Sequence, residues 1–447
     1  MKILSINSGS SSLKFMLYDY EKKETLTTGI VERVGIEGSF IEFSTKDGKV
    51  KDVHQCPDHE VAIKLMMDKM TNPEYGIIGS MSEIAAVGHR VLHGGEKITE
   101  SVIVTDEIIK IFKSLYDLGP LHMPPNVTGI EAARAVLPNV PHMAIMDTAF
   151  HRTMPESSYM YAVPYEWYDK YAIRRYGFHG TSHLYVSRRA SVLLGKEPKD
   201  TNVVVLHIGN GASACAIKNG KCFDTSMGLT PLEGLVMGTR SGDLDPAILK
   251  FVCEKENKSP AEMDSILNKK AGLLGITGKF SDRRDVLSGA EAGDKRCQLA
   301  IDLEAYRLKK YIGAYIAAIG SCDAIIFTAG VGEFNATVRE KAVEGLEHLG
   351  IKLDKSKNQL SRTRSTETLI SADDSTIKIF VIPTDEETVF IEDVVGLLNG
   401  TYKDPSEFVY PFQKTDYVNK QREESLAAEL AKNPKLKEII AKPAARK

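Results

Sequence analysis

The sequence has no long apolar run and no recognisable targeting segment. No stretch of about 18 apolar residues occurs, which excludes a typical membrane-spanning helix. The first residues, MKILSINSGS, lack the apolar core and the cleavage site of a signal peptide. We therefore expect a cytoplasmic protein without a membrane partner.

The sequence also has little net charge and few cysteines. A formal net charge of −3 gives no general attraction for nucleic acid, so an anionic substrate must be held by local groups in a cleft. With 447 residues, 43% of them hydrophobic and 26% charged, the chain is globular and long enough for more than one domain. The six cysteines lack metal-type spacing, which favours reduced thiols: Cys56, Cys215, Cys222, Cys253, Cys297 and Cys322.

Two glycine turns are the most informative feature that is present. Residues 6–14 (INSGSSSLK) lie between two strand-like runs, and residues 206–213 (LHIGNGAS) form a weaker copy. Glycine lets the backbone approach an anion closely, and exposed N–H and serine hydroxyl groups donate to phosphate oxygens. Alone, either stretch is also compatible with an ordinary hairpin turn. Three residues recur at one constant offset, which predicts two copies of a nucleotide-handling unit: Leu4, Ile6 and Gly9 return as Leu206, Ile208 and Gly211.

The expected secondary structure repeats in the same order in both halves of the chain. Strands precede helices in the first half, with strands expected over 3–6, 13–18, 29–34 and 40–44 and helices over 60–70, 106–116 and 126–136. The second half has strands over 202–208, 212–217 and 221–225, with Asn219-Gly220 as a type I′ hairpin turn. A long helix over 297–319, strands over 324–328 and 377–382, and a helix from the capping box at 384–387 to Gly400 follow. This order predicts an α/β fold built twice.

Polar clusters follow several of the apolar runs. Arg90 (in HRVLHGG, 89–95) and Asp147 (in DTAFH, 147–151) each follow a predicted strand, where open α/β sheets bind ligands. His179 lies in RRYGFHGTSH (174–183), just before a helix whose N-terminus attracts anions. Arg240 lies in the glycine loop MGTRSGDLDP (237–246) and suits charge stabilisation at a transferring phosphoryl group.

Each of these residues also has a purely structural interpretation. Arg90 and Arg240 would be surface ion-pair partners, the latter of Asp243 or Asp245. Asp147 would cap an Asx-type turn, and His179 would be a hydrogen-bonded structural histidine. Glu386 would be a first-turn acid that balances its own helix dipole.

In combination, the motifs resemble the acetate kinase family. The resemblance rests on residues 7–14, 89–95, 147–151, 175–183, 207–211 and 238–243, which occur in the family's order, and it extends from about Met1 to about Leu398. That family belongs to the actin-like sugar-kinase and heat-shock-ATPase superfamily. The resemblance implies an α/β fold with two ribonuclease-H-like domains related by duplication and an active site in the interdomain cleft.

The resemblance also implies a division into domains. Residues 1–150 with 386–400 would form the N-terminal domain, which carries the acid-binding residues, and 151–385 the C-terminal domain, which carries the nucleotide-binding residues. Residues 401–447 extend past the usual family end and have no assigned role. They are basic near their end, and a solvated, partly disordered tail is expected in preference to a docked segment.

For chemistry, the resemblance implies reversible in-line transfer of the ATP γ-phosphoryl group to acetate, giving acetyl phosphate and ADP with Mg²⁺ or Mn²⁺, in a homodimer. Arg90 would hold the acetate carboxylate, with Asp147, His179 and Arg240 as the other catalytic residues. Asn7 and Glu386 would be the metal-associated pair. The acetate methyl group would contact Leu92, Leu121, Phe178 and Pro231. The nucleotide would contact Ser10, Ser12, Lys14, His207, Gly209, Asn210, Gly211, Asp282, Arg283, Arg284, Gly330, Val331, Gly332 and Glu333.

Two positions depart from the family pattern. Phe334-Asn335 follows Glu333 where the family usually has Asn-Ser, and Asp385 replaces an Asn before Glu386. Phe334 would either stack on the adenine base or crowd it. Asp385 would add a negative charge beside the metal-associated carboxylate.

Three alternatives to an ATP-dependent acetate kinase stay open. They are a propionate kinase, a pyrophosphate-dependent acetate kinase and a non-catalytic actin-like ATP-binding module. Gly330-Val331-Gly332 favours a nucleotide over pyrophosphate as the phosphoryl donor. Arg90, Arg240 and His179 favour an enzyme, because a binding module needs no carboxylate anchor or second cation at the γ-phosphoryl group.

Overall fold

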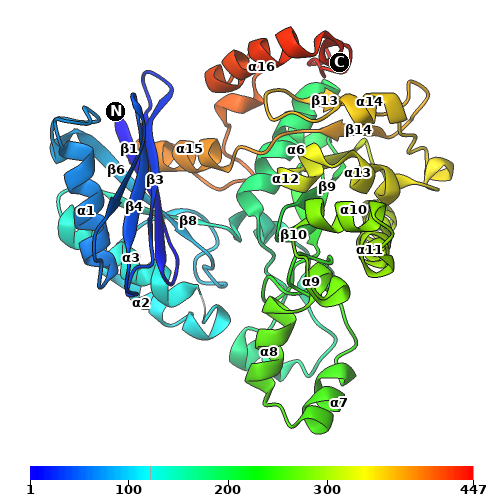
Figure 1. Ribbon diagram of the computed structural model, residues 1–447, viewed down its shortest axis with the longest axis horizontal. Coiled ribbons are helices and arrows are strands. Elements are labelled where there is room, and N and C mark those ends of the chain that lie inside the picture. The colour runs from blue at the N-terminus through cyan, green and yellow to red at the C-terminus, as the bar shows by residue number, and fades with distance from the viewer. Residues whose placement is uncertain (121, 446–447) are drawn as a thin grey trace. The chain divides into compact units, whose positions relative to one another are not determined.

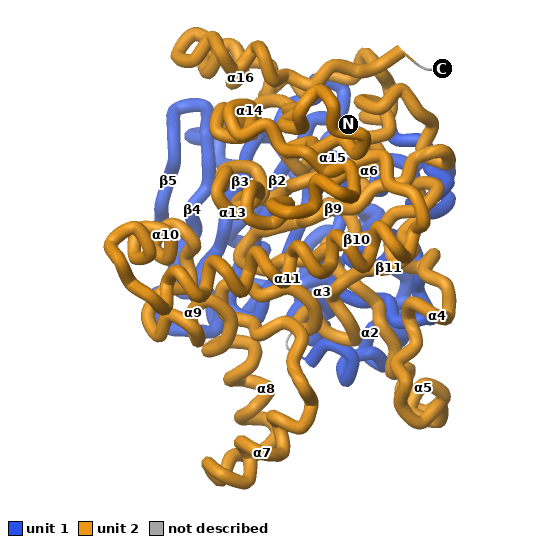
Figure 2. The backbone as a smooth tube through the Cα atoms, turned by 90° about the vertical axis from the view of Figure 1, so that its right-hand side faces the viewer, with its two compact units in different colours: residues 1–150, 386–410 blue, residues 151–385, 411–447 orange. Residues whose placement is uncertain are grey.

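The computed structural model describes residues 1–120 and 122–445, which form two compact units. Unit 1 comprises residues 1–150 and 386–410, and unit 2 comprises 151–385 and 411–447 (Figure 2). Each unit contains one mixed β-sheet with helices packed against it (Figure 1). Within the described ranges, no helix is both long and apolar enough to cross a membrane.

The sheet of unit 1 has the strand order β5-β4-β3-β2-β1-β6-β8-β7. The first five strands form an antiparallel meander, whereas β6 runs parallel to β1 and β8 parallel to β6. The carboxyl ends of β1, β6 and β8 therefore lie at one edge of the sheet. The strands are β1 (Lys2–Ser8), β2 (Ser12–Asp19), β3 (Glu24–Glu32), β4 (Phe40–Thr45), β5 (Gly48–Val53), β6 (Ile84–Val91), β7 (Val102–Ile103) and β8 (His142–Met146).

Helices cover the sheet of unit 1 and enclose several apolar core clusters. Helices α1 (His59–Thr71) and α3 (Met123–Val136) pack on one core with Leu4, Ile6 and Leu13, and α2 (Asp106–Lys113) packs beside α3. Helix α15 (Glu386–Leu398) contributes Phe390 to another of these clusters. Gly88 of β6 allows this approach, because a Cβ there would lie 2.4 Å from the Phe390 ring.

The sheet of unit 2 repeats the central part of the first. Its order is β11-β10-β9-β12-β14-β13, with antiparallel β9–β10 and β10–β11 pairs and parallel β9–β12 and β12–β14 pairs. The series β11-β10-β9-β12-β14 thus matches β3-β2-β1-β6-β8, which confirms the predicted duplication. The strands are β9 (Val203–Ile208), β10 (Ala212–Lys218), β11 (Lys221–Thr225), β12 (Ala324–Thr328), β13 (Thr368–Leu369) and β14 (Lys378–Val381).

Two long helices pack on this second sheet. Helix α6 (Gly180–Leu194) contacts β9 and β12, and α11 (Lys295–Ile319) contacts β10 and β9. Helices α7 and α8 extend away from the sheet (Figure 1). The other helices of unit 2 are α4 (Glu156–Tyr159), α5 (Glu166–Tyr171), α7 (Ala247–Glu256), α8 (Pro260–Lys269), α9 (Gly272–Thr277), α10 (Arg283–Glu291), α12 (Ala329–Phe334), α13 (Ala336–Val343), α14 (Lys355–Leu360) and α16 (Lys420–Lys432).

The β10–β11 hairpin has the turn that its sequence predicts. Asn219 and Gly220 have φ values of 52° and 71°, as a type I′ turn requires at its two central residues.

The expectation of a solvated C-terminal tail is wrong. The described residues from 411 onward pack on unit 2, where Phe412, Leu436 and Ile439 are buried. Arg189 of α6 donates a 2.8 Å hydrogen bond to the Phe412 carbonyl, and Ile440 forms a β-bridge with Thr368. The segment is basic overall, but it contains a few apolar side chains that complete the core of unit 2. Its overall composition therefore did not indicate this packing.

Candidate functional site

Three predicted site residues of unit 1 lie at the carboxyl edge of its sheet. Asn7 is the second-last residue of β1, Arg90 is the second-last residue of β6, and Asp147 directly follows β8. The parallel register places Ile6 beside His89, and Arg90 beside Ile145. The fold therefore gathers these side chains from positions far apart in the chain.

Arg90 and Asp147 form a two-point ion pair. The Arg90 Nε and Nη2 atoms donate to the two Asp147 carboxylate oxygens at 2.9 and 2.6 Å. The Asp147 side chain is only 5% exposed, whereas that of Arg90 is 39% exposed. The Asp147 carboxylate, and to a smaller extent Glu386, raises the pKa of the Arg90 guanidinium. The ion pair uses one edge of the guanidinium, so its Nη1 side can still donate to a second anion.

Glu386 is the first residue of α15, so it also occupies the helix-start position that the structural interpretation requires. Its charge acts on Arg90, which places it near the same edge of unit 1. Asn7, Asp147 and Glu386 carry amide or carboxylate oxygens, the donors that a hard divalent cation prefers. The residues present therefore fit a Mg²⁺ or Mn²⁺ ion.

The first glycine turn connects β1 to β2 and is closed by a hydrogen bond from the Gly9 N–H to the Ser12 carbonyl at 2.8 Å. Ser10 and Lys14 are exposed, and Ser12 is partly exposed. His59 of α1 supports the turn from behind through a 2.8 Å hydrogen bond to the Gly9 carbonyl. The turn thus has a fixed backbone with polar side chains on its open side.

Asn126 of α3 supports the same edge and is absent from the predicted site. Its amide oxygen accepts from the Leu92 N–H at 3.1 Å, and its amide nitrogen donates to the Ser8 carbonyl at 2.8 Å. One side chain thereby joins the ends of β1 and β6. Gly129 permits this close packing, since a Cβ there would lie 2.0 Å from the Ser8 hydroxyl. The only sequence signal is a polar residue at the start of an apolar helical pattern.

The second glycine turn connects β9 to β10 in unit 2. The Gly209 N–H donates to the Gly211 carbonyl at 2.9 Å, and the Gly238 N–H donates to the Asn210 carbonyl at 3.0 Å. Arg283 is buried, forms a 2.6 Å hydrogen bond to Glu304 and donates to the Gly209 carbonyl at 2.6 Å. Arg283 thus supports the turn.

Arg240 lies beside this turn without a carboxylate partner among the described residues. Its Nη1 atom donates to the Pro231 carbonyl at 3.1 Å and lies 3.5 Å from where a Cβ of Gly211 would be. Burial lowers the pKa of the Arg240 guanidinium. Asp243, a partner in the surface-pair interpretation, is paired instead with Arg307 at 3.1 Å. A cation with no compensating charge can accept an anionic ligand.

His179 and His207 stack beside the same turn. Their ring centroids are 4.1 Å apart and the ring planes differ by 19°. The His179 Nε2 atom lies 3.7 Å from the Cβ position of Gly211, and the His207 Nε2 atom lies 3.8 Å from that of Gly209. His179 has a left-handed φ of 60° at the start of α6, a conformation that is uncommon for residues other than glycine. Two imidazoles and one guanidinium thus line the second turn.

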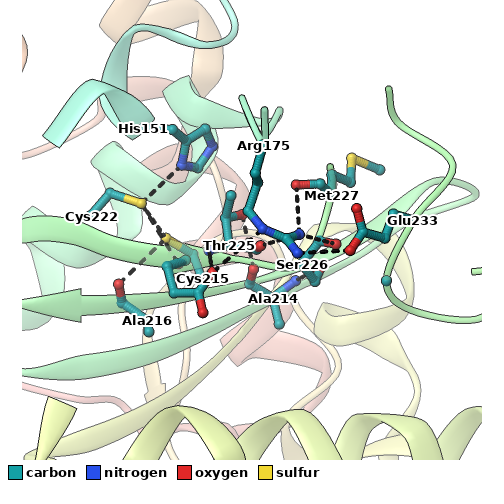
Figure 3. A network of polar contacts seen from close by, with 12 residues as sticks. His151, Arg175, Ala214, Cys215, Ala216, Cys222, Thr225, Ser226, Met227 and Glu233 are labelled. Carbon is teal, nitrogen blue, oxygen red and sulfur yellow. Dashed lines mark hydrogen bonds and ion pairs between the residues drawn. The ribbon is translucent and has the colours of Figure 1, made fainter. Parts of the chain in front are cut away.

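Arg175 organises the loop that follows β11 (Figure 3). Its Nη1 atom donates to the carbonyls of Thr225, Ser226 and Met227 at 2.9, 3.1 and 3.2 Å, and its Nη2 atom donates to Glu233 at 2.7 Å. Gly177, with a φ of 77°, packs against Thr225 where a Cβ would clash. The predicted site contains Phe178 and His179 from this motif but omits Arg175, which fixes the motif in place.

A thiol and imidazole cluster lies next to this network (Figure 3). The His151 Nδ1 atom lies 3.1 Å from the Cys222 sulfur, which lies 3.5 Å from the Cys215 sulfur. These donors could hold a soft cation, but burial raises the pKa of the Cys222 thiol far above its usual value, so the thiol keeps its proton. The His151 Nε2 atom hydrogen-bonds to the Phe178 carbonyl at 2.9 Å. The cluster therefore fixes Phe178, which precedes His179.

The predicted nucleoside-framing residues divide into buried and exposed groups. Glu333 is buried, accepts a 2.7 Å hydrogen bond from Arg364 and faces the Thr384 N–H at 3.3 Å. Gly332 packs against β12, and Gly330 and Val331 are partly exposed at the start of α12. Phe334 is 43% exposed, with the Arg364 guanidinium 5.4 Å from its ring centre. Asp282 and Arg284 form an exposed ion pair at the start of α10.

The predicted methyl-contacting residues come from both units. Leu92 packs on a core cluster of unit 1. In unit 2, Phe178 is buried, and Pro231 is partly exposed with its carbonyl bonded to Arg240. Leu121 lies outside the described residues.

Asp385 does not add an uncompensated charge before Glu386. Its carboxylate accepts a 2.9 Å hydrogen bond from Asn419 and lies 3.7 Å from the Arg422 guanidinium. Both partners belong to the C-terminal extension. The extension therefore balances the charge that distinguishes this position from the family pattern.

Comparison with known proteins identifies the relatives of this chain. A family model described as the acetokinase family matches residues 2–392. An acetate kinase of Geobacter sulfurreducens is 58% identical over 421 residues, which cover 94% of this chain and 100% of the relative. The crystal structure of Porphyromonas gingivalis acetate kinase superposes with a TM-score of 0.85 at 44% identity, over 89% of this chain and 99% of that one. A propionate kinase from Francisella tularensis gives a TM-score of 0.81 at 37% identity, over 89% and 99% of the two chains.

Proposed function

This chain belongs to the acetokinase family, and on that premise we propose that it is an acetate kinase. The reaction is reversible transfer of the ATP γ-phosphoryl group to acetate, giving acetyl phosphate and ADP. The observation that carries the proposal is the position of Arg240, a partly buried cation beside the second glycine turn with no carboxylate partner in the described structure. Phosphoryl transfer requires such charge at the transferring group.

Within unit 1, the acid substrate binds at the carboxyl edge of the sheet. The acetate carboxylate accepts hydrogen bonds from the Nη1 side of Arg90, whose other edge is held by Asp147. This ion pair orients the guanidinium before acetate binds, so less conformational entropy is lost on binding. Asp147 thus positions the guanidinium that binds the acetate carboxylate. We also assign Asp147 to the catalytic residues.

Within unit 2, the phosphates bind at the second glycine turn. His207, Gly209, Asn210 and Gly211 contact the phosphates, while His179 and Arg240 stabilise the charge of the transferring group. In unit 1, Ser10, Ser12 and Lys14 line the first glycine turn, and their role as phosphate donors stays a prediction. Asp282, Arg284, Gly330, Val331 and Gly332 frame the nucleoside, and the exposed Phe334 ring offers a stacking surface. Arg283 and Glu333 support this frame through their buried partners.

Asn7 and Glu386 would hold Mg²⁺ or Mn²⁺ in this proposal. The ion neutralises phosphate charge when it is bound.

We further propose a homodimer in the cytoplasm. Exposed apolar side chains support an interface in unit 2, among them Trp167, Tyr171, Ile248 and Phe251. Sedimentation velocity of the 49.3 kDa chain tests this assembly.

One experiment tests the proposed function directly. The purified full-length chain is given ATP, Mg²⁺ and acetate, and both ADP and acetyl phosphate are measured, the latter as its hydroxamate. Release of ADP that depends on acetate, with equal acetyl phosphate, is the expected result. ATP binding or hydrolysis without acetyl phosphate would instead indicate a non-catalytic or different ATP-binding protein.

Because a propionate kinase is among the similar structures, propionate is the second candidate for the acid substrate. The same assay with propionate and butyrate measures kcat/KM for each acid. A higher value for propionate than for acetate would assign a propionate kinase. Replacement of ATP by pyrophosphate tests the third alternative, and we expect no product from that donor.

A further inference from the structure

Ser213 of β10 bridges two histidines of unit 2. Its hydroxyl oxygen lies 2.9 Å from His179 Nδ1 and 2.7 Å from His183 Nε2. Ser213 is fully buried and has one proton to donate, so it donates to one ring and accepts from the other. The directions of these two hydrogen bonds determine which nitrogen of His179 carries hydrogen.

The surroundings of His183 set that direction. Its Nδ1 atom is buried and has no hydrogen-bond partner among the described residues. Burial also lowers the pKa of this ring well below its usual value, so His183 is neutral and has one N–H group. An orphaned buried N–H is rarer in proteins than an unpaired acceptor, which places the proton of His183 on Nε2. His183 therefore donates to Ser213, and Ser213 donates to His179 Nδ1.

A second, independent series of hydroxyl hydrogen bonds leads to His207. Thr384 donates a 2.8 Å hydrogen bond to the Ser182 oxygen, and Ser182 lies 2.8 Å from His207 Nδ1. Because Ser182 accepts from Thr384, its own proton is available to His207 Nδ1. In both rings, Nδ1 is then an acceptor and Nε2 carries the hydrogen.

We infer that Ser213 and Ser182 are positioning residues that set the tautomers of His179 and His207, so that both rings present an Nε2–H group to the Gly209–Gly211 turn. The distances of 3.7 and 3.8 Å from the two Nε2 atoms to the glycine Cβ positions define this direction. Two donors then face the backbone on which, under the proposed function, the phosphates lie. The role of these donors in phosphate binding rests on the proposed function, whereas the assignment of the tautomers does not.

Histidine ¹⁵N NMR tests the inference without turnover. Long-range ¹H–¹⁵N spectra of the full chain, with its 11 histidines labelled, distinguish a protonated from an unprotonated ring nitrogen. His179→Gln and His207→Gln assign the two signals. We expect both rings as Nε2–H tautomers in the native protein. Ser213→Ala is expected to mix the tautomers of His179 only, and Ser182→Ala those of His207 only.

Controls separate tautomer control from general disturbance. Ser213→Thr keeps the hydroxyl and is expected to keep the Nε2–H signal of His179. Ser187→Ala removes another buried hydroxyl of α6, which donates to the Leu184 carbonyl at 2.8 Å, and it should change neither ring. In acetate phosphorylation, Ser213→Ala should lower kcat by about tenfold to a hundredfold with little change in the KM for ATP, the scale seen when a supporting group is removed.

An Nδ1–H tautomer of His179 in the native protein would overturn the inference, as would an unchanged His179 signal in Ser213→Ala. If that variant fails to fold, the native spectrum and Ser182→Ala still decide the two assignments. A chain with the expected tautomers but no acetyl phosphate would contradict the proposed function alone. Active enzyme with the opposite tautomers would contradict this inference alone.

Discussion

Arg422 of α16 holds the chain next to Asp385 by three contacts. It donates hydrogen bonds to the carbonyls of Pro383 and Thr384 at 3.1 and 2.8 Å, and its guanidinium lies 3.7 Å from the Asp385 carboxylate. These residues directly precede Glu386, the first residue of α15. The C-terminal extension therefore fixes the segment that leads into a proposed metal-associated carboxylate.

Removal of this contact should reduce stability through Asp385. Arg422→Ala removes the cation that balances the largely buried Asp385 carboxylate, which keeps its hydrogen bond from Asn419. It also removes the donor to the Pro383 and Thr384 carbonyls, and the expected cost is about 1–3 kcal/mol in the free energy of unfolding. Asp385→Asn in the Arg422→Ala background should recover part of the loss. Urea unfolding of both single variants and the double variant measures the coupling. Lys435→Ala, an exposed change in the same extension, is the control, and additive effects would contradict a functional pairing of Arg422 with Asp385.

Arg240→Ala should damage the chemical step more than nucleotide binding. Loss of the cation beside the transferring phosphoryl group is expected to lower kcat by about two to four decades, with a much smaller change in ATP affinity. Steady-state kinetics and ATP titration measure the two effects separately. Lys250→Ala, which removes a highly exposed cation, should leave both unchanged. A near-normal kcat in Arg240→Ala would remove Arg240 from the catalytic group.

Leu92→Ala should broaden the acid pocket. An extra methylene then meets less steric resistance, so the ratio of kcat/KM for propionate over acetate should rise by about one decade, while the efficiency with acetate falls. Leu118→Ala truncates a leucine that packs on the same core cluster and controls for a general loss of packing. An unchanged ratio in Leu92→Ala would mean that Leu92 does not contact the acyl chain.

Glu386→Gln should separate a metal ligand from a helix-start acid. The variant keeps the side-chain shape but loses the charge, so the rise in Tm caused by Mg-ADP and acetate should lose most of its magnesium-dependent part. Thermal shifts with and without Mg²⁺ provide the measurement. Glu387→Gln removes the other first-turn acid of α15 and tests the helix-dipole contribution alone. An undiminished magnesium-dependent shift in Glu386→Gln would leave only the helix-start role.

Asp393 of α15 should make unit 1 less stable as the pH rises. Its carboxyl accepts hydrogen bonds from Ser101 and Tyr410 at 2.8 and 2.7 Å, and burial raises its pKa to about 7. Below about pH 4 the Asp393 carboxyl is protonated in both the folded and the unfolded state. Between about pH 4 and pH 7 it is protonated only in the folded state. The contribution of Asp393 to the free energy of unfolding therefore falls from about pH 4 to pH 7 and is flat above that range.

The Asp393 effect is measured as the difference in unfolding free energy between the native chain and Asp393→Asn, at a series of pH values. The difference should change in favour of the variant as the pH increases to about 7. A difference that is constant over this range would show that Asp393 has an ordinary pKa in the folded state.

The sequence by itself determined the duplicated α/β plan and most strand and helix positions. Each of those features depends on neighbouring residues: alternating or helical apolar spacing, Asn219-Gly220 at the hairpin, and glycines at the ends of β1 and β9. The apolar runs before Arg90 and Asp147 also placed both residues near strand ends, although Arg90 lies within β6 and only Asp147 follows its strand. Their family roles came from the ordered motifs and stay predictions.

Only the tertiary structure decided which of these side chains meet. Arg90 contacts Asp147 across 57 residues, Asn126 joins two strand ends, and Ser213 connects His183 to His179. The burial of Phe412, Leu436 and Ile439 corrected the expected solvated tail, and the charge that Asp385 adds is paired with Arg422 of the same extension. Such contacts leave no local pattern, because partners distant in the chain are brought together only when the sheets and their covering helices pack.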